Sequence, residues 1–199
     1  MAYPADIHPE SRNRLPVVHR DALDEQGKRL YDEVTTPSPV SIAGLQGPGG
    51  IMLHNTRLAE PHRAYNKVLR TEAALGPALT ELAILVVARE MSQQFEWTVH
   101  EPQARKAGLD PRAIDIVKHR MPIDGLGEKE TAIIRVGREA LRDRKVSSAT
   151  YAQAERLFGR QTLVSITAIM GAYSATAIML TVFDQQLAPE MAPRLPSLT

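Results

Sequence analysis

The run of seven apolar residues from Leu82 to Ala88 restricts the fold more than any other part of the chain. A helix that is apolar around its whole circumference must be enclosed by other elements on every side. Polar residues follow this run at helical spacing: Arg89, Gln93, Glu96 and His100. If the helix is continuous, these four share one stripe. Polar groups beside so apolar a run are unfavourable unless they are paired or used, so we expect the site here.

The rest of the chain predicts helices and no period-two strand pattern. Asp110-Pro111 is a helix start, Gly108 is a helix terminator, and Thr80 and Ser148 are expected N-caps. We expect an all-α protein of about eight helices in one domain. The number of helices follows from the apolar periodicity and from the residues that start and end helices. The expected ranges are 21–34, 55 or 58 to 75, 80–107 with a pause near Ser92, 110–119, 129–144, 148–159 and 160–187.

The domain expectation has three parts. Residues 1–20 form an irregular N-terminal arm, 21–187 form a single all-α domain, and 188–199 form an irregular tail. The uncharged run Leu163–Phe183 is long enough to span a bilayer. We interpret it as a buried helix, because it carries Ser and Thr and because Gly171 and Ala175 allow other helices to approach closely.

Composition excludes several chemistries. The chain has 24 basic and 23 acidic residues with a net charge of +1, which argues against nucleic-acid or anionic-membrane partners. It has no cysteine, so it contains no disulfide, thiolate nucleophile or cysteine metal ligand. The N-terminus lacks the apolar segment of a secretory signal. We expect a cytoplasmic protein.

The segment from Glu81 to Gly108 resembles the carboxymuconolactone decarboxylase and alkylhydroperoxidase-D-like family. In that family a Glu, a Cys-x-x-Cys and a His lie in an all-helical core. Here Glu81 falls on the glutamate and His100 on the histidine, whereas Gln93 and Glu96 stand at the two cysteine positions. The Glu96-Trp97-x-x-His100 motif resembles the cysteine-free branch, and the resemblance covers roughly residues 50–187.

The missing cysteines decide which family chemistry the resemblance can imply. Thiol peroxidase activity needs a thiolate, which this chain lacks, so we do not expect it. The decarboxylase branch needs no thiol. The resemblance therefore implies a cofactor-free decarboxylase or lactone-processing lyase, acting by acid/base catalysis on a small carboxylated compound of aromatic catabolism.

The resemblance also implies roles for individual residues. His100 would be the general acid/base, Glu96 its orienting partner, Glu81 a second proton relay and Arg89 the anchor of the substrate carboxylate. Glu81 can meet His100 only if the chain folds back near Ser92. Further candidate residues that line the substrate pocket are Gln93, Trp97, His54 and Asn55.

Structural alternatives remain open for each of these residues. His100 can be a core histidine bonded to Glu96, and Glu81 can complement a helix dipole. Trp97 is more typical of a core or a subunit interface. Glu101 and Arg105 read as a solvated pair. No metal or cofactor is expected, since the spacings match no common metal motif.

The second function hypothesis is a non-catalytic member that assembles or binds small molecules, as the residues at the cysteine positions suggest. In both readings the expected partners are a small carboxylate or lactone and further copies of this chain. The apolar helices and the resemblance imply a homo-oligomer, either a trimer or a hexamer.

Overall fold

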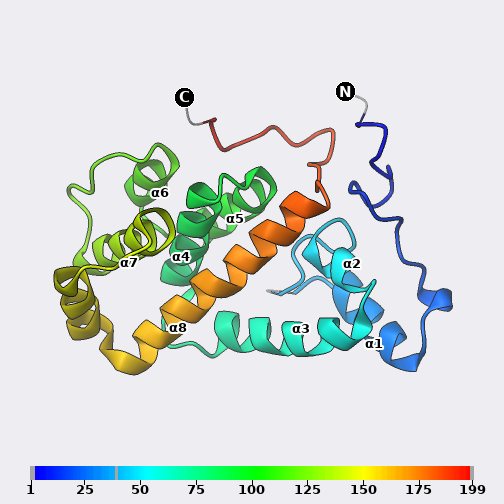
Figure 1. The fold of residues 1–199 in the computed structure, drawn as a ribbon, viewed down its shortest axis with the longest axis horizontal. Helices are drawn as coiled ribbons and strands as arrows, with labels where there is room; N and C mark the ends of the chain where they lie inside the picture. Colours follow the sequence, from blue (N-terminus) through cyan, green and yellow to red (C-terminus); the bar gives the residue numbers. More distant parts are fainter. Residues whose placement is uncertain (1–2, 39, 198–199) are drawn as a thin grey trace. The chain divides into compact units, whose positions relative to one another are not determined.

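The computed structural model describes residues 3–38 and 40–197, and in those ranges its secondary-structure elements are all helices, with no strand. The main helices are α1 (Glu25–Thr35), α2 (Pro48–Met52), α3 (Thr56–Thr71), α4 (Pro77–Glu90), α5 (Gln94–Lys106), α6 (Pro111–Lys118), α7 (Glu128–Arg138) and α8 (Ser148–Val182) (Figure 1). A 3-10 turn, η1 (Arg20–Ala22), precedes α1, and a π-helical turn, η2 (Glu139–Asp143), follows α7. The all-α fold class is confirmed.

The chain divides into two compact units, each described by itself. The first comprises the described residues up to Glu72 together with Ile178–Ala192, and the second comprises Ala73–Ala177 together with the tail from Pro193. Residues 3–19 contain no helix. The expectation of a single domain over 21–187 stays a prediction.

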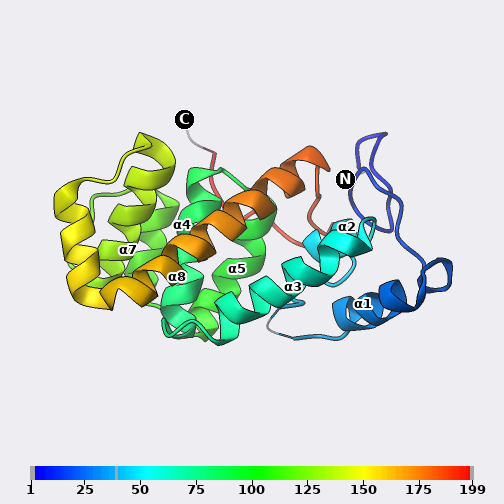
Figure 2. The ribbon, with the colours of Figure 1, turned by 60° about the horizontal axis from the view of Figure 1, so that its bottom comes forward.

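In the first unit, α1 and α2 pack against α3 (Figure 2). Their core contains Leu30, Val34, Leu53 and Ala59. The N-terminal segment joins the residues after α8 through buried amides: Asn13 Nδ2 donates to Gln185 Oε1 at 2.9 Å, and Gln185 Nε2 donates to the Arg12 carbonyl at 3.1 Å. These bonds satisfy polar groups that would otherwise be buried without partners.

In the second unit, α4 is the central helix, and α5, α6 and α7 pack against it (Figure 2). Every residue from Leu82 to Ala88 is at most 1% exposed, as the apolar run predicts. The approach of α7 is close enough that a Cβ on Gly137 would lie 2.3 Å from Val86 Cγ1. A glycine at this position therefore permits the packing.

Several helix ends follow the sequence signals and others do not. Asp110 caps α6 by accepting from Arg112 N, and Gly108 follows α5 with φ 80°. Thr80 is not the N-cap of α4: the helix begins at Pro77 after Gly76, and the Thr80 hydroxyl donates to the Gly76 carbonyl. At the start of α8, the hydroxyl of Ser147, rather than Ser148, accepts from Thr150 N.

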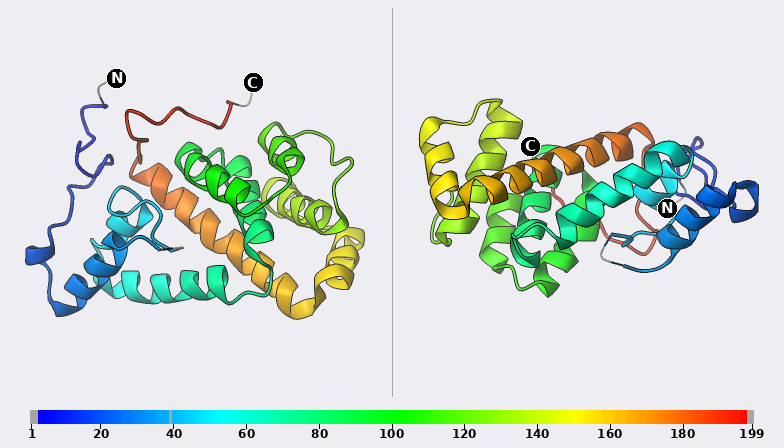
Figure 3. Two further views of the ribbon diagram at one scale, coloured as in Figure 1. Left: turned by 180° about the vertical axis from the view of Figure 1, so that it is seen from behind. Right: turned by 90° about the horizontal axis from the view of Figure 1, so that it is seen from below.

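Helix α8 differs from the expected fully buried helix. It bends at Gly159, where φ is 70° and ψ is 165° (Figure 3). By length and composition it could cross a membrane, a test that core helices of globular proteins also pass, and 39% of its most apolar window is buried. Val164, Ile178 and Val182 are each more than half exposed. One face is therefore buried and another is open, as expected of a helix packed from one side.

Candidate active site

The turn between α4 and α5 creates the candidate site. Ser92 has a φ of 52°, and Gln93 caps α5 by accepting a hydrogen bond from Phe95 N at 3.0 Å. The predicted pause at Ser92 is thus a reversal of the chain, and α5 packs back along α4. The four-residue stripe from Arg89 to His100 does not exist, because it required one continuous helix.

The reversal brings Glu81 of α4 to His100 of α5. His100 Nδ1 lies 2.8 Å from Glu81 Oε2, and the two residues are only 7% and 4% exposed. The Tyr173 ring packs edge-on against the imidazole, with 5.3 Å between centroids. The chain folds back near Ser92, which was the condition for a contact between Glu81 and His100. His100 is bonded to Glu81 and not to Glu96.

This contact orients the imidazole. A carboxylate at Nδ1 accepts the proton there, which favours the tautomer with Nε2 free to accept one. Among residues 3–38 and 40–197, no group forms a hydrogen bond with Nε2. Glu81 therefore holds the Nδ1 side of the imidazole and fixes the orientation of the ring.

Glu96 has a different role from the one expected. Both of its carboxyl oxygens are buried and neither has a hydrogen-bond partner in the part of the chain that the structure describes. Burial raises the pKa of Glu96 well above its usual range, because the charged form is poorly solvated there. It lies one turn before His100 on α5. The carboxylate that contacts the imidazole is Glu81, and Glu96 is a buried carboxyl group without that contact.

Glu101, on the same helix, is a buried glutamate whose oxygens accept hydrogen bonds. It is 2% exposed and not on a solvated face, which corrects the expectation for the Glu101–Arg105 pair. Burial raises its pKa, but hydrogen bonds from Arg105, Trp97 and Lys118 outweigh this and lower it. Trp97 is fully buried and donates its indole N–H to Glu101 Oε2 at 2.9 Å. This geometry gives Trp97 a core role rather than a place in the pocket wall.

Arg89 is likewise engaged within the fold. It is 1% exposed, and Nη1 donates to the carbonyls of Lys118 and Pro196, at 3.2 and 2.8 Å. Burial, followed by the charge of Arg120, lowers its pKa. Its guanidinium connects the C-terminal tail to the end of α4. These contacts favour a structural role over the expected anchoring of a substrate carboxylate, because both terminal nitrogens already have partners and the remaining Nε is buried.

The remaining predicted residues divide between the units. Gln93 is 8% exposed and its Nε2 donates to the Ala177 carbonyl at 3.4 Å, so it belongs to the second unit with His100. His54 and Asn55 belong to the first unit. His54 Nε2 lies 3.0 Å from the Pro16 carbonyl, and Asn55 precedes α3 without a side-chain cap.

Sequence reasoning missed Tyr173. The signal available was a single hydroxyl-bearing aromatic ring on the uncharged helix, which is also typical of a core residue. Within the described ranges, no group of three or more His, Asp and Glu side chains is placed to hold a metal ion.

Comparisons with known proteins agree with this fold and motif. Residues 58–139 match the model of the carboxymuconolactone decarboxylase family. The fold is similar to a crystal structure from Ralstonia eutropha JMP134, described as an alkylhydroperoxidase AhpD core and an uncharacterised peroxidase-related protein. That likeness has a TM-score of 0.71 at 15% identity and covers 94% of this chain and 100% of the other. No curated protein matches the chain. The resemblance seen in the sequence is thus confirmed: residues 58–139 match the carboxymuconolactone decarboxylase family, and the fold is similar to that of the AhpD-like protein.

Proposed function

We propose that this protein is a cofactor-independent enzyme that decarboxylates, or otherwise processes, a small carboxylated lactone by acid/base catalysis. The observation that carries the proposal is the 2.8 Å contact between the buried Glu81 carboxylate and His100 Nδ1. A buried pair of this kind, with the outer ring nitrogen unengaged, is typical of a proton-transfer site.

The chemistry requires two proton-handling groups with different tasks. When the carboxylate leaves as CO2, its bonding electron pair stays on carbon, and that carbon must receive one proton. Burial raises the pKa of Glu96 and so favours its protonated form, which can donate this proton. Each turnover consumes one proton, which His100 Nε2 can take up from solvent and pass to Glu96 to restore the acid. Arg89 is left out of the mechanism because its two terminal nitrogens are engaged within the fold.

Thiol peroxidase activity is no part of the proposal. The peroxidase-related description belongs to the Ralstonia protein, and at 15% identity the likeness concerns the fold. The present chain has no cysteine to attack a peroxide. We expect no consumption of alkyl hydroperoxide, with or without a thiol reductant.

The test is turnover of 4-carboxymuconolactone and related carboxylated lactones, followed by mass spectrometry for loss of CO2. We expect His100→Ala to lower kcat by about 10²- to 10⁴-fold, the usual contribution of a general acid/base. Glu81→Gln should lower it by a smaller factor, because the amide can still contact the ring but cannot stabilise its charged form. His119→Ala and Glu128→Gln, at exposed positions, are the matched controls.

The pH dependence of kcat distinguishes a catalytic role of Glu96 from a purely structural one. A neutral donor at Glu96 predicts that Glu96→Gln removes one limb of the kcat profile, whereas a structural role would lower the rate at all pH values alike. If the wild-type protein turns over none of these lactones, or if both His100→Ala and Glu81→Gln retain full rates, the mechanism is wrong. The non-catalytic binding protein is then the better description.

A further inference from the structure

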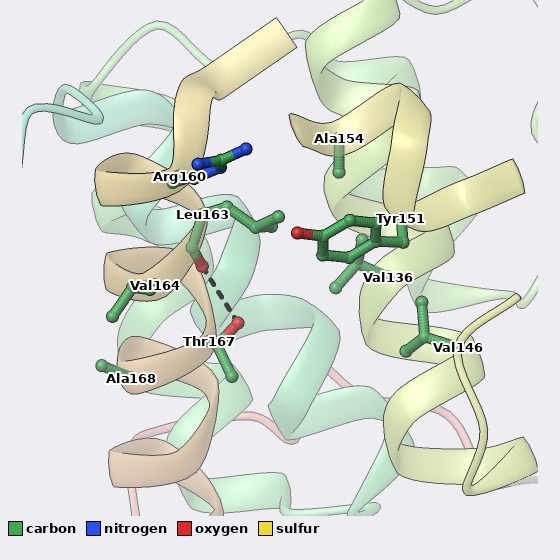
Figure 4. Close-up of a pocket in the computed structure, with 9 residues that line it drawn as sticks. All are labelled: Val136, Val146, Tyr151, Ala154, Arg160, Leu163, Val164, Thr167 and Ala168. Atoms are coloured by element: carbon green, nitrogen blue, oxygen red, sulfur yellow. Dashed lines mark hydrogen bonds between the residues drawn. The ribbon is translucent and has the colours of Figure 1, made fainter. Parts of the chain in front are cut away.

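A cavity lies within the second unit, and its lining does not include the Glu81–His100 pair. It has a volume of about 620 Å³, in the range of small-molecule sites. Neither Glu81 nor His100 is among its lining residues, which are Val136, Val146, Tyr151, Ala154, Arg160, Leu163, Val164, Thr167 and Ala168 (Figure 4).

The bend of α8 forms two walls of this cavity. Gly159 takes a backbone conformation that side chains other than glycine rarely adopt, so the helix changes direction there. Tyr151 and Ala154 come from the part before the bend, and Leu163 and Thr167 come from the part after it. Figure 4 shows the Tyr151 ring reaching across the gap, with its hydroxyl toward the helix that carries Leu163.

The lining is apolar apart from one end. Its aliphatic residues are joined by the face of Tyr151, which is 50% exposed. The Thr167 hydroxyl donates to the Leu163 carbonyl at 2.9 Å, so its proton is engaged within the helix (Figure 4). An occupant of this cavity therefore needs a hydrocarbon body, because few polar groups there can replace bonds to water.

Arg160 supplies the charged end. Its Nε donates to Glu155 Oε1 at 2.7 Å, and in the described part of the chain no other hydrogen-bond partner of its guanidinium occurs. The two terminal nitrogens therefore remain available. They form the edge of the guanidinium that binds a carboxylate through two parallel hydrogen bonds.

We propose that this cavity binds an amphipathic monocarboxylate, with its hydrocarbon part against Tyr151 and Leu163 and its carboxylate on the outer edge of Arg160. Glu155 occupies the Nε of the guanidinium, so the two terminal nitrogens leave room for one further carboxylate and for no second one. This site is independent of the proposed function, because it shares no residue with the Glu81–His100 pair.

Calorimetric titration with octanoate and with 1-octanol tests the two halves of the proposal. Octanoate should bind the wild-type protein, and Arg160→Gln should weaken that binding at least tenfold while leaving 1-octanol binding unchanged. Glu155→Gln should tighten octanoate binding, because it removes a competing carboxylate. The variant Ala168→Phe should fill the cavity and weaken both ligands, whereas Ala175→Phe, exposed on the same helix outside the cavity, should not.

His100→Ala should bind octanoate like the wild-type protein, so loss of turnover and loss of this site are distinguishable. The proposal is overturned if Arg160→Gln binds octanoate as tightly as the wild type, or if His100→Ala abolishes binding. It is also overturned if binding disappears as protein concentration rises, which would show a second copy in the groove. Arg160 is exposed, so its variant remains decisive even if Ala168→Phe does not fold.

Discussion

At the scale of single residues, Glu96 and Glu101 are two buried glutamates on one helix whose pKa values are shifted in opposite directions. Glu101 receives hydrogen bonds from Trp97, Arg105 and Lys118, whereas neither oxygen of Glu96 has a partner in the described ranges. In the sequence, the two glutamates lie five positions apart on the same segment. Their pKa values differ in direction because side chains donate hydrogen bonds to Glu101 and none is donated to Glu96 in the described ranges.

The raised pKa of Glu96 predicts a particular pH dependence of stability. The folded protein keeps the proton of Glu96 above the pKa of the unfolded chain, which is about 4.3. The folded state then binds more protons than the unfolded state, so this residue lowers stability as pH rises from there toward its folded pKa. Glu96→Gln should remove that loss, and its advantage should grow by at most about 1.4 kcal/mol per pH unit.

Urea unfolding of the wild type and Glu96→Gln at pH 5, 6, 7 and 8 measures this difference. Glu128→Gln, which removes an exposed carboxylate, is the control. A stability difference between Glu96→Gln and wild type that stays constant from pH 5 to 8 would show that Glu96 is ionised in the folded protein.

Residue types at the site were predictable from sequence, but their pairing was not. The motif identified Glu81, Glu96 and His100, and the pause at Ser92 was visible as a loss of helical pattern. Which glutamate would meet the imidazole depended on the direction of α5 after Ser92. Because that direction is set by the packing of α5 against α4, helical spacing alone favoured the wrong partner.

At the scale of elements, the contact between α4 and α7 depends on a missing side chain. A Cβ at Gly137 would lie 2.3 Å from Val86 Cγ1, and Val86 is 1% exposed. We expect Gly137→Ala to lower the free energy of unfolding by about 1–3 kcal/mol, as overpacking does. In the double variant Gly137→Ala/Val86→Ala the clash is removed, so the two effects should not add. A double-mutant cycle by urea unfolding measures the coupling, and strict additivity would refute this contact.

The bend of α8 makes a separate prediction. A Cβ at Gly159 would meet no atom within 4 Å, so any effect of Gly159→Ala comes from the backbone conformation. We expect a loss of about 1–3 kcal/mol in thermal or urea unfolding, the usual cost of this region for residues other than glycine. Gly171→Ala, also in open space but within regular helix, should be neutral or stabilising. Equal effects of the two substitutions would contradict the bend.

At the scale of the whole molecule, the open face of α8 favours self-association. Ile178 and Val182 are exposed on a helix that carries no charge from Leu163 to Phe183. Exposed apolar surface of this kind is typical of interfaces. We expect sedimentation velocity to show a trimer or hexamer, and Ile178→Lys to shift it toward the monomer. Lys129→Glu, at an exposed charged position, should not, and a monomeric wild type would refute the prediction.

Local chemistry was sufficient to predict the helical class, the enclosed α4 run, the α6 start at Asp110 and the absence of thiol chemistry. Each of these depends on periodicity, capping or composition over a few residues. Three features needed the assembled fold: the Glu81–His100 contact, the isolation of Glu96 and the engagement of Arg89 with Lys118 and Pro196. All three join residues or elements brought together by packing, and a one-dimensional pattern carries no information about which buried polar groups meet.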